Sequence, residues 1–170
     1  KRYNDIVTVI IPRHLDRTKK IQELSSNLNL KTQLLNDGDK ILNNKEIIIV
    51  NSFGVLQKYF NYAKSVFIGK SIIKRLKKVS GQNPIDAAKL GCKIYHGPYV
   101  YNFQEIYELL RKNNISKMIK DYKDLSKFLV SDLKVIKKKQ NNKYSKIKNL
   151  EQDILLKTFR TLDKFLNNEN

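Results

Sequence analysis

The sequence predicts an α/β domain whose parallel sheet carries helices on both faces. Short apolar runs rich in β-branched residues alternate along the chain with longer stretches whose apolar residues fall at helical spacing. This alternation is typical of βαβ units. The first apolar run, residues 6–11, has no polar residue except one threonine, as expected for a central strand that is covered on both faces.

Length and composition indicate one globular domain. The chain has 170 residues, of which 41% are hydrophobic and 29% are charged, and this excludes a disordered chain. A single cysteine excludes an intramolecular disulfide framework and, with two histidines, argues against a transition-metal site. No apolar run approaches the roughly 20 residues that span a bilayer. The chain opens into a strand-like run without a signal peptide, so we expect it to come from within a longer protein.

The expected elements follow one another without a repeat or a linker. The expected strands span residues 6–11, 31–35, 46–50, 65–69, 92–96 and 115–119. The expected helices span residues 14–28, 55–63, 84–90 and 102–112. We expect residues 1–122 to form one Rossmann-like domain. Residues 123–170 carry apolar stripes at helical spacing, and we expect them to form helices that pack on this domain or on a neighbouring one.

Turn-forming residues follow four of the expected strands. These turns are Pro12-Arg13-His14, Asn51-Ser52-Phe53-Gly54, Gly69-Lys70-Ser71 and Gly97-Pro98-Tyr99. Ligands of open parallel sheets bind outside the carboxyl ends of the strands, so we expect the four loops to line one crevice. Arg13 would place a guanidinium at its mouth for phosphate or carboxylate, with His14 as a hydrogen-bonding neighbour. Alternatively, both residues belong to a solvated turn.

Residues 80–86 form a further candidate loop. Asn83 suits a helix N-cap, Pro84 suits the first helical position, and Asp86 suits a capping box. A well-made helix start explains all three. A ligand site is the alternative: Gly81 allows close approach, free N–H groups at the helix start attract phosphate, and Asp86 accepts hydrogen bonds from a ribose diol. No pair of acidic residues suggests a catalytic centre.

Positive charge dominates the chain. Lys and Arg exceed Asp and Glu by 34 to 16, which gives a net charge of +18. The cations concentrate in residues 70–78 and in residues 134–148. Such an excess favours an anionic partner: a nucleic acid, a phosphate-bearing ligand or an acidic membrane. An ordinary solvated surface explains part of the same charge.

The motifs occur in an order that resembles a known family. They are Ile11-Pro12-Arg13-His14, Asn51-Ser52-Phe53-Gly54, Phe67-Ile68-Gly69, Gly81-Gln82-Asn83-Pro84-Ile85-Asp86-Ala87-Ala88 and Gly97-Pro98-Tyr99-Val100-Tyr101-Asn102-Phe103. Together they closely resemble the C-terminal domain of the Kdo transferases. These enzymes of lipopolysaccharide synthesis transfer 3-deoxy-D-manno-octulosonic acid (Kdo) from CMP-Kdo to lipid A precursor. The motifs cover roughly residues 6–110, and the remainder resembles the family by pattern only.

The resemblance implies the donor-binding, C-terminal half of a GT-B glycosyltransferase, without a metal or cofactor. It implies a nucleotide site formed by Arg13, His14, Phe53, Gly54, Val55, Gly81, Asn83, Pro84, Ile85 and Asp86. The family's general base is a glutamate of the N-terminal domain, so we expect this chain to lack it and to be inactive alone. The implied acceptor is lipid A precursor, bound through that N-terminal domain. The implied location is the anionic cytoplasmic face of the inner membrane of Gram-negative bacteria.

The chain departs from the family pattern at several positions. Asp86 replaces a longer acid, Val55 stands where an acid follows the glycine, Asn51 replaces an aspartate, and Tyr99 replaces a histidine. Gln82 stands in place of the histidine of a Gly-Gly-His sequence.

Two other functions compete with the one that the resemblance implies. A nucleic-acid-binding module is suggested by charge alone, but the sequence has no recognised nucleic-acid motif, so no nucleic-acid partner is expected. A structural domain with an empty crevice is the other alternative.

Overall fold

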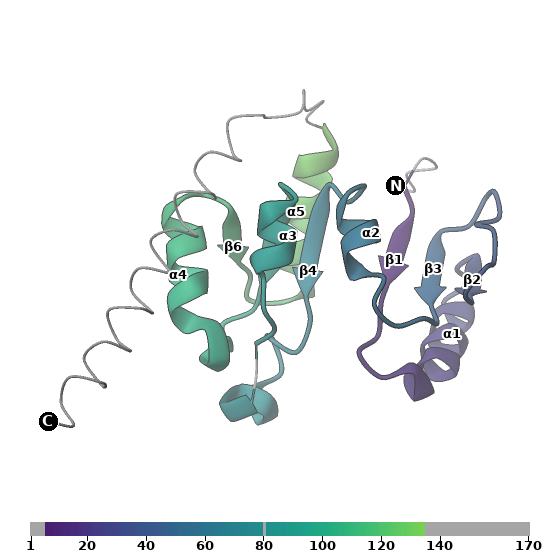
Figure 1. The fold of residues 1–170 in the computed structure, drawn as a ribbon, viewed down its shortest axis with the longest axis horizontal. Coiled ribbons are helices and arrows are strands. Elements are labelled where there is room, and N and C mark those ends of the chain that lie inside the picture. The colour runs from purple at the N-terminus through teal and green to yellow at the C-terminus, as the bar shows by residue number, and fades with distance from the viewer. Residues whose placement is uncertain (1–5, 80, 135–170) are drawn as a thin grey trace, which may run out of the picture. The chain divides into compact units, whose positions relative to one another are not determined.

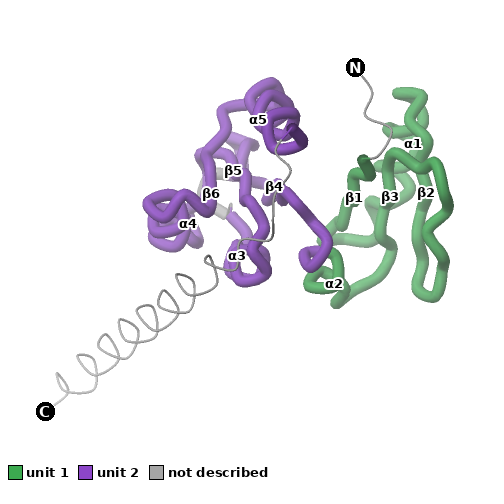
Figure 2. The backbone as a smooth tube through the Cα atoms, turned by 90° about the horizontal axis from the view of Figure 1, so that it is seen from above, with its two compact units in different colours: residues 1–59 green, residues 60–170 purple. Residues whose placement is uncertain are grey.

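The computed structural model describes residues 6–79 and 81–134, with side chains except at residues 77–79. The chain divides into two compact units, residues 1–59 (unit 1) and residues 60–170 (unit 2) (Figure 2). Each unit contains a three-stranded parallel sheet with helices against it (Figure 1). This confirms the predicted Rossmann-like arrangement of parallel strands and flanking helices.

Unit 1 is built on the buried strand β3 (Ile47–Val50), which lies between β1 (Thr8–Ile10) and β2 (Thr32–Leu35). A short 3-10 helix, η1 (Leu15–Arg17), leads into α1 (Thr18–Asn27), which packs on β2 and β3. One hydrophobic cluster of this unit consists of Leu35, Ile48 and Val50. Val55 and Tyr59, which lie directly before α2 (Leu56–Phe60) and within it, pack against this cluster. Both faces of β3 are therefore covered, which explains its uninterrupted apolar sequence.

Unit 2 repeats the arrangement, with β5 (Lys93–His96) between β4 (Ser65–Ile68) and β6 (Ser116–Met118). Helices α3 (Ile85–Lys89) and α4 (Gln104–Lys112) lie on one face of this sheet, and α5 (Tyr122–Lys134) lies on the other (Figure 2). Two 3-10 helices, η2 (Lys74–Val79) and η3 (Tyr101–Phe103), lie in the loops after β4 and β5.

The main core of unit 2 lies between its sheet and the helices α3 and α4. Its buried members are Ile68, Ala87, Ala88, Cys92, Ile94, Val100, Tyr107, Leu110 and Ile115. Successive side chains of a strand point to opposite faces, so Ile94 belongs to this core while its neighbours Lys93 and Tyr95 face α5. Burial raises the pKa of the Cys92 thiol to about 11, and this thiol is therefore protonated at neutral pH.

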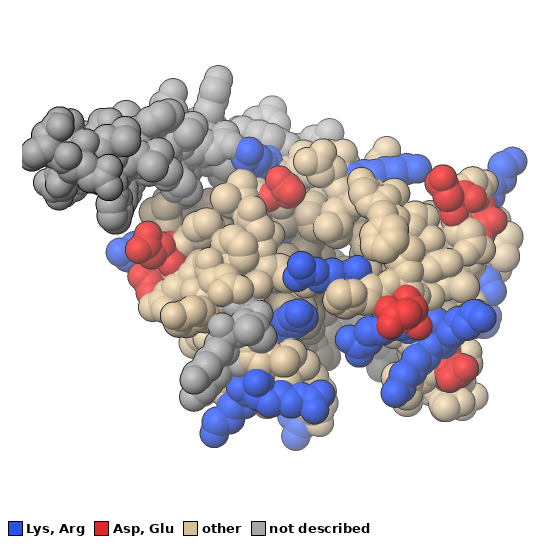
Figure 3. Space-filling model, turned by 60° about the horizontal axis from the view of Figure 1, so that its bottom comes forward, with Lys and Arg blue, Asp and Glu red and all other residues tan. Residues whose placement is uncertain are grey.

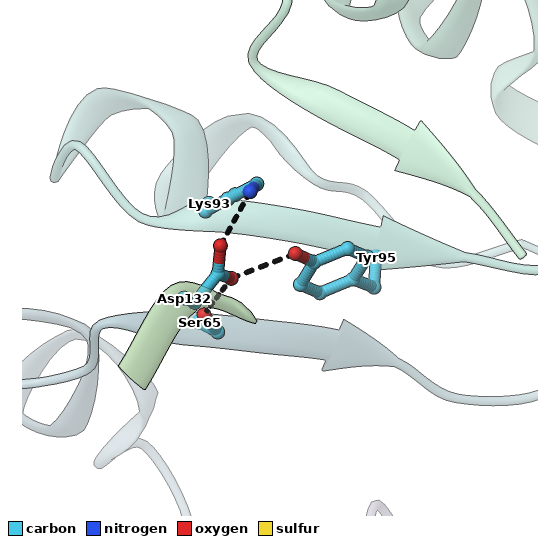
Figure 4. Close-up of polar contacts among 4 residues, drawn as sticks. All are labelled: Ser65, Lys93, Tyr95 and Asp132. Carbon is cyan, nitrogen blue, oxygen red and sulfur yellow. Dashed lines mark hydrogen bonds and ion pairs between the residues drawn. The ribbon is translucent and has the colours of Figure 1, made fainter. Parts of the chain in front are cut away.

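A buried carboxylate joins α5 to the sheet. Asp132, which is 8% exposed, accepts hydrogen bonds from the Tyr95 hydroxyl at 2.7 Å and the Ser65 hydroxyl at 2.8 Å, and it pairs with the Lys93 ammonium (Figure 4). The ring of Phe128, one turn earlier on α5, stacks on the Tyr95 ring with 6.0 Å between centroids. Three strand residues thus hold one side chain of α5.

Two pKa shifts follow from this arrangement. Burial alone would raise the pKa of Asp132, but the hydrogen bonds from Lys93, Tyr95 and Ser65 outweigh burial and lower it. Burial likewise would lower the pKa of Lys93, yet its hydrogen bond to Asp132 raises it. Both groups are therefore charged at neutral pH.

All the strands and helices predicted between residues 6 and 119 are present. Each strand is shorter than predicted by one to three residues, and α3 and α4 begin later than predicted. The predicted division at residue 122 stays a prediction, because only α5 of the expected C-terminal helices lies in the described part. Within that part, no helix has the length and apolar character to cross a membrane.

Candidate functional site

The expected site residues fall into two groups, one in each unit. Unit 1 contains Arg13, His14, Phe53, Gly54 and Val55, and unit 2 contains Gly81, Asn83, Pro84, Ile85 and Asp86. Within its own unit, each group lies where parallel strands end. This is the edge at which open α/β sheets bind their ligands.

The unit 1 group stands on the loops that follow β1 and β3. These strands pair in parallel with Ile10 opposite Ile49, so both loops leave the same edge. The Asn51 side chain joins the loop after β3 to α1 and to the loop after β2: its Oδ1 accepts a hydrogen bond from the Thr18 hydroxyl at 3.4 Å, and its Nδ2 donates to the side chain of Asn36 at 2.9 Å. Asn51 therefore both donates and accepts hydrogen bonds at this edge.

The side chains of Arg13 and His14 are exposed, as a ligand-binding role requires. His14 is extended, with φ −118° and ψ 116°, and directly precedes η1. After β3, Phe53 is 74% exposed, and Gly54 has a φ of +76° with no atom within 4 Å of the position that a Cβ would take. Gly54 therefore turns the chain in a conformation that favours glycine and leaves its main chain open to solvent.

The unit 2 group forms the start of α3. The Asn83 side chain makes the hydrogen bond expected of a capping residue, since its Oδ1 accepts from the N–H of Ile85 at 2.9 Å. The prediction was wrong by one residue in the boundary: Pro84 is the N-cap, and its carbonyl accepts the first helical bond from Ala88 at 3.0 Å. Because proline has no N–H, the first amide that needs a partner is that of Ile85. Asp86 is exposed in the first turn.

Two contacts fix the approach to α3. The Tyr107 hydroxyl, on α4, donates to the carbonyl oxygen of Gln82 at 2.9 Å. Gly81 has a φ of +95°, and a Cβ on it would lie 3.1 Å from the Val100 Cα. Gly81 is therefore required by backbone conformation and by close packing against the loop after β5. Its predicted role, the close approach of a ligand, stays a prediction.

Sequence reasoning placed Ser71 in a turn at this edge without giving it a role of its own, yet this residue organises the edge. Ser71 is fully buried; its hydroxyl donates to the Ile68 carbonyl at 2.6 Å and accepts from the Gly97 N–H at 2.8 Å. Its own carbonyl accepts from the Tyr99 N–H at 2.9 Å. The loops after β4 and β5 are thus joined directly. A serine three residues after β4 and a glycine directly after β5 were the available signal.

His96 was also missed, and it lies beneath this edge. It is 1% exposed, its ring lies 4.3 Å from that of Tyr107, and its Nδ1 is 2.7 Å from the Gly97 carbonyl oxygen. Burial lowers the pKa of His96, and the contact with Gly97 only partly opposes that effect. The imidazole is therefore neutral at physiological pH, with Nδ1 donating to Gly97.

A surface hollow of about 410 Å³ lies beside this region. It is lined by Pro98, Tyr99, Val100, Tyr101, Gln104, Glu108, Arg111 and Met118. None of the ten expected site residues lines it. The described residues contain no cluster of three or more His, Cys, Asp or Glu side chains placed to hold a metal ion.

Curated relatives confirm the resemblance that the motifs indicate. The 3-deoxy-D-manno-octulosonic acid transferase of Rickettsia prowazekii is 28% identical over 98% of this chain and 36% of its own length. That of Rickettsia typhi is 30% identical over 77% of this chain and 27% of its own. A bifunctional glycosyltransferase/methyltransferase of Fusobacterium nucleatum is 26% identical over 75% of this chain and 20% of its own. This chain therefore spans about a third or less of the relatives' length.

A solved structure confirms the fold. The C-terminal CMP-Kdo binding domain of WaaA from Acinetobacter baumannii matches with a TM-score of 0.68 and 21% sequence identity, over 86% of this chain and 72% of that one. No family model matches the chain. The chain is thus similar in sequence to Kdo transferases and similar in fold to the C-terminal domain of one of them.

Proposed function

We propose that this chain is the donor-binding part of a Kdo transferase and that its ligand is CMP-Kdo. The observation that carries the proposal is positional. The motifs shared with the family lie at the carboxyl ends of the strands in each unit, in a fold similar to that of a CMP-Kdo binding domain.

Each group of residues, taken by itself, suits part of a cytidine nucleotide. In unit 1, the exposed guanidinium of Arg13 suits the phosphate or the sugar carboxylate, and the open main chain at Gly54 suits the base. In unit 2, the exposed first turn of α3 at Asp86 suits the phosphate, because N–H groups at a helix start attract anions. The exposed Asp86 carboxylate suits the hydroxyl groups of the ribose.

We further propose that the chain binds the donor without transferring its sugar. The general base of the family belongs to the N-terminal domain, and none of the ten proposed residues takes that role. Acceptor binding, lipid A precursor as the acceptor, and a location at the cytoplasmic face of the inner membrane belong to the whole enzyme.

An NMR titration with CMP tests the proposal on the chain as it exists. We expect CMP to shift the amide signals of residues 13–14, 53–55 and 81–86 selectively, and AMP at the same concentration to shift them less. The Arg13→Ala variant should lose affinity, whereas the control Lys19→Ala, an exposed change elsewhere in unit 1, should not. A folded chain that shows no response to millimolar CMP would contradict the proposal. Sugar transfer by the chain alone would contradict the assignment of the base to another domain.

A further inference from the structure

The loop between β4 and α3 carries a dense group of cations. Within this loop, η2 contains Lys74, Arg75, Lys77 and Lys78, and the whole sequence has no Asp or Glu between Glu46 and Asp86. The side chains of Lys74 and Arg75 are exposed, and neither pairs with a carboxylate in the part of the chain that the structure describes. Figure 3 shows Lys and Arg side chains gathered on the face where η2 lies. Within the described residues, the charges of Lys74 and Arg75 therefore have no internal partner of opposite sign.

An exposed apolar side chain stands next to these cations. Ile73 directly precedes η2 and is 43% exposed, and its carbonyl accepts a hydrogen bond from the Leu76 N–H at 2.9 Å. An apolar side chain flanked by cations on a surface turn is the composition of a segment that lies at a membrane interface. The apolar group enters the acyl boundary there while the cations meet anionic headgroups.

The loop is held firmly at its base. Ser71, two residues before Ile73, is fully buried and bonded to Ile68, Gly97 and Tyr99. A Cβ on Gly97 would lie 2.2 Å from the Ser71 carbonyl oxygen, so the two loops are in close contact. The base from which the cations project is therefore part of the folded unit.

We infer that Ile73, Lys74 and Arg75 form a docking surface for an anionic lipid bilayer. The inference deepens the proposed membrane location, on which it rests, by assigning lipid contact to one surface of unit 2. A nucleic acid would also attract the cations, but residues 69–79 contain no aromatic side chain on which a base could stack. The phosphate backbone of a nucleic acid also provides no apolar surface against which the exposed Ile73 side chain could be buried.

Vesicle sedimentation with the full chain tests the inference. Wild type should bind vesicles of phosphatidylglycerol and phosphatidylcholine but not vesicles of phosphatidylcholine alone. Each cation near an anionic surface contributes about fivefold to binding, so Lys74→Glu/Arg75→Glu should weaken binding by roughly 20-fold or more. The matched control is Lys19→Glu/Lys20→Glu, which changes two adjacent exposed cations on α1 by the same charge and should bind nearly as wild type does. Ile73→Gln should weaken the binding that remains at high salt.

Two results would overturn the inference. One is equal loss of vesicle binding in both double variants, which would mean that overall charge alone drives association. The other is wild-type binding to an RNA oligomer that exceeds its binding to anionic vesicles and is lost in Lys74→Glu/Arg75→Glu. CMP binding, measured on the same samples, separates this inference from the proposed function. Loss of vesicle binding with normal CMP binding would support the lipid surface, and failure of wild type to bind CMP would reject the donor site alone.

Discussion

The hydroxyl of Tyr107 donates a hydrogen bond to the carbonyl oxygen of Gln82 at 2.9 Å. Tyr107 is fully buried in the core of unit 2, and burial raises its pKa well above the ordinary value for tyrosine. The hydroxyl is therefore protonated and remains a donor throughout the physiological range. A core residue of α4 thus fixes the segment that leads to Asn83 and the start of α3.

Removing this hydroxyl should weaken nucleotide binding. Tyr107→Phe keeps the ring in the core and deletes one hydrogen bond, which contributes about 0.5–1.5 kcal/mol. If the bond holds residues 82–86 in their binding conformation, affinity for CMP should fall by about two- to tenfold, as measured by calorimetric titration. The matched control is Tyr95→Phe, in which an equally buried tyrosine loses a bond to Asp132. It should lower stability without changing CMP affinity, and equal affinity losses in both variants would reject a positioning role for Tyr107.

The parallel strands were predictable because their apolar runs are short, strong and bounded by turn residues. The strand over Ile47–Val50 is a clear example, since both of its faces are buried. Backbone conformation near proline was harder to predict. The sequence indicates a helix start near Asn83. Whether Asn83 or Pro84 is the N-cap depends on which carbonyl accepts the first helical hydrogen bond, and in the structure this is the carbonyl of Pro84.

Replacing Gly97 with alanine should destabilise unit 2 strongly. The new Cβ would lie 2.2 Å from the Ser71 carbonyl oxygen, and backbone atoms cannot give way as a flexible side chain can. We expect a loss of about 3 kcal/mol in the free energy of unfolding, measured by urea denaturation. The control is Gly69→Ala, in the loop after β4, where no atom lies within 4 Å of the added carbon. That variant should stay within about 1 kcal/mol of wild type, and equal stability of the two variants would contradict the close approach of the loops.

Asp132 should make stability depend on acid pH. Its pKa in the folded chain lies below its usual value near 3.8, so folding favours the charged form. The stabilisation is complete at any pH above the pKa that Asp132 has in the unfolded chain. It is lost as the pH falls through the lower pKa that Asp132 has in the folded chain. Asp132→Asn should therefore lower stability near neutrality by about 2 kcal/mol; the figure is modest because the Lys93 side chain is 31% exposed.

The difference between Asp132→Asn and wild type is the quantity to measure, because burial of His96 also makes stability fall in acid. Urea denaturation at several pH values should show this difference shrinking as pH drops below about 4. Asp37→Asn, in an exposed turn of unit 1, should show no such trend. A difference that stays constant down to pH 2 would mean that the Asp132 charge does not support α5.

The candidate site is proposed from motifs, whereas the contacts that support it were not predictable from the sequence. Exposed residues such as Arg13 and Asp86 occur in motifs that are short and local in sequence. Ser71 and Tyr107 act instead through contacts with Gly97 and Gln82, which are 26 and 25 residues away. No local pattern announces a hydrogen bond across such a separation, and only the pairing of strands brings the partners together.

The length of the acid at position 86 provides a final test of the donor site. In this chain the carboxylate of Asp86 is one methylene shorter than the family's usual acid, and it is exposed at the start of α3, so either substitution below should be tolerated by the fold. If this carboxylate accepts hydrogen bonds from the ribose, Asp86→Asn should weaken CMP binding by about tenfold, because hydrogen bonds to a charged acceptor contribute roughly 1.5–3 kcal/mol.

Asp86→Glu should bind at least as tightly as wild type, since the longer side chain extends toward the ligand. Binding of 2′,3′-dideoxy-CMP, which lacks the ribose hydroxyls, should be equal in all three proteins. Asp86→Asn binding CMP as wild type does would remove Asp86 from the proposed site while leaving Arg13 to be tested separately.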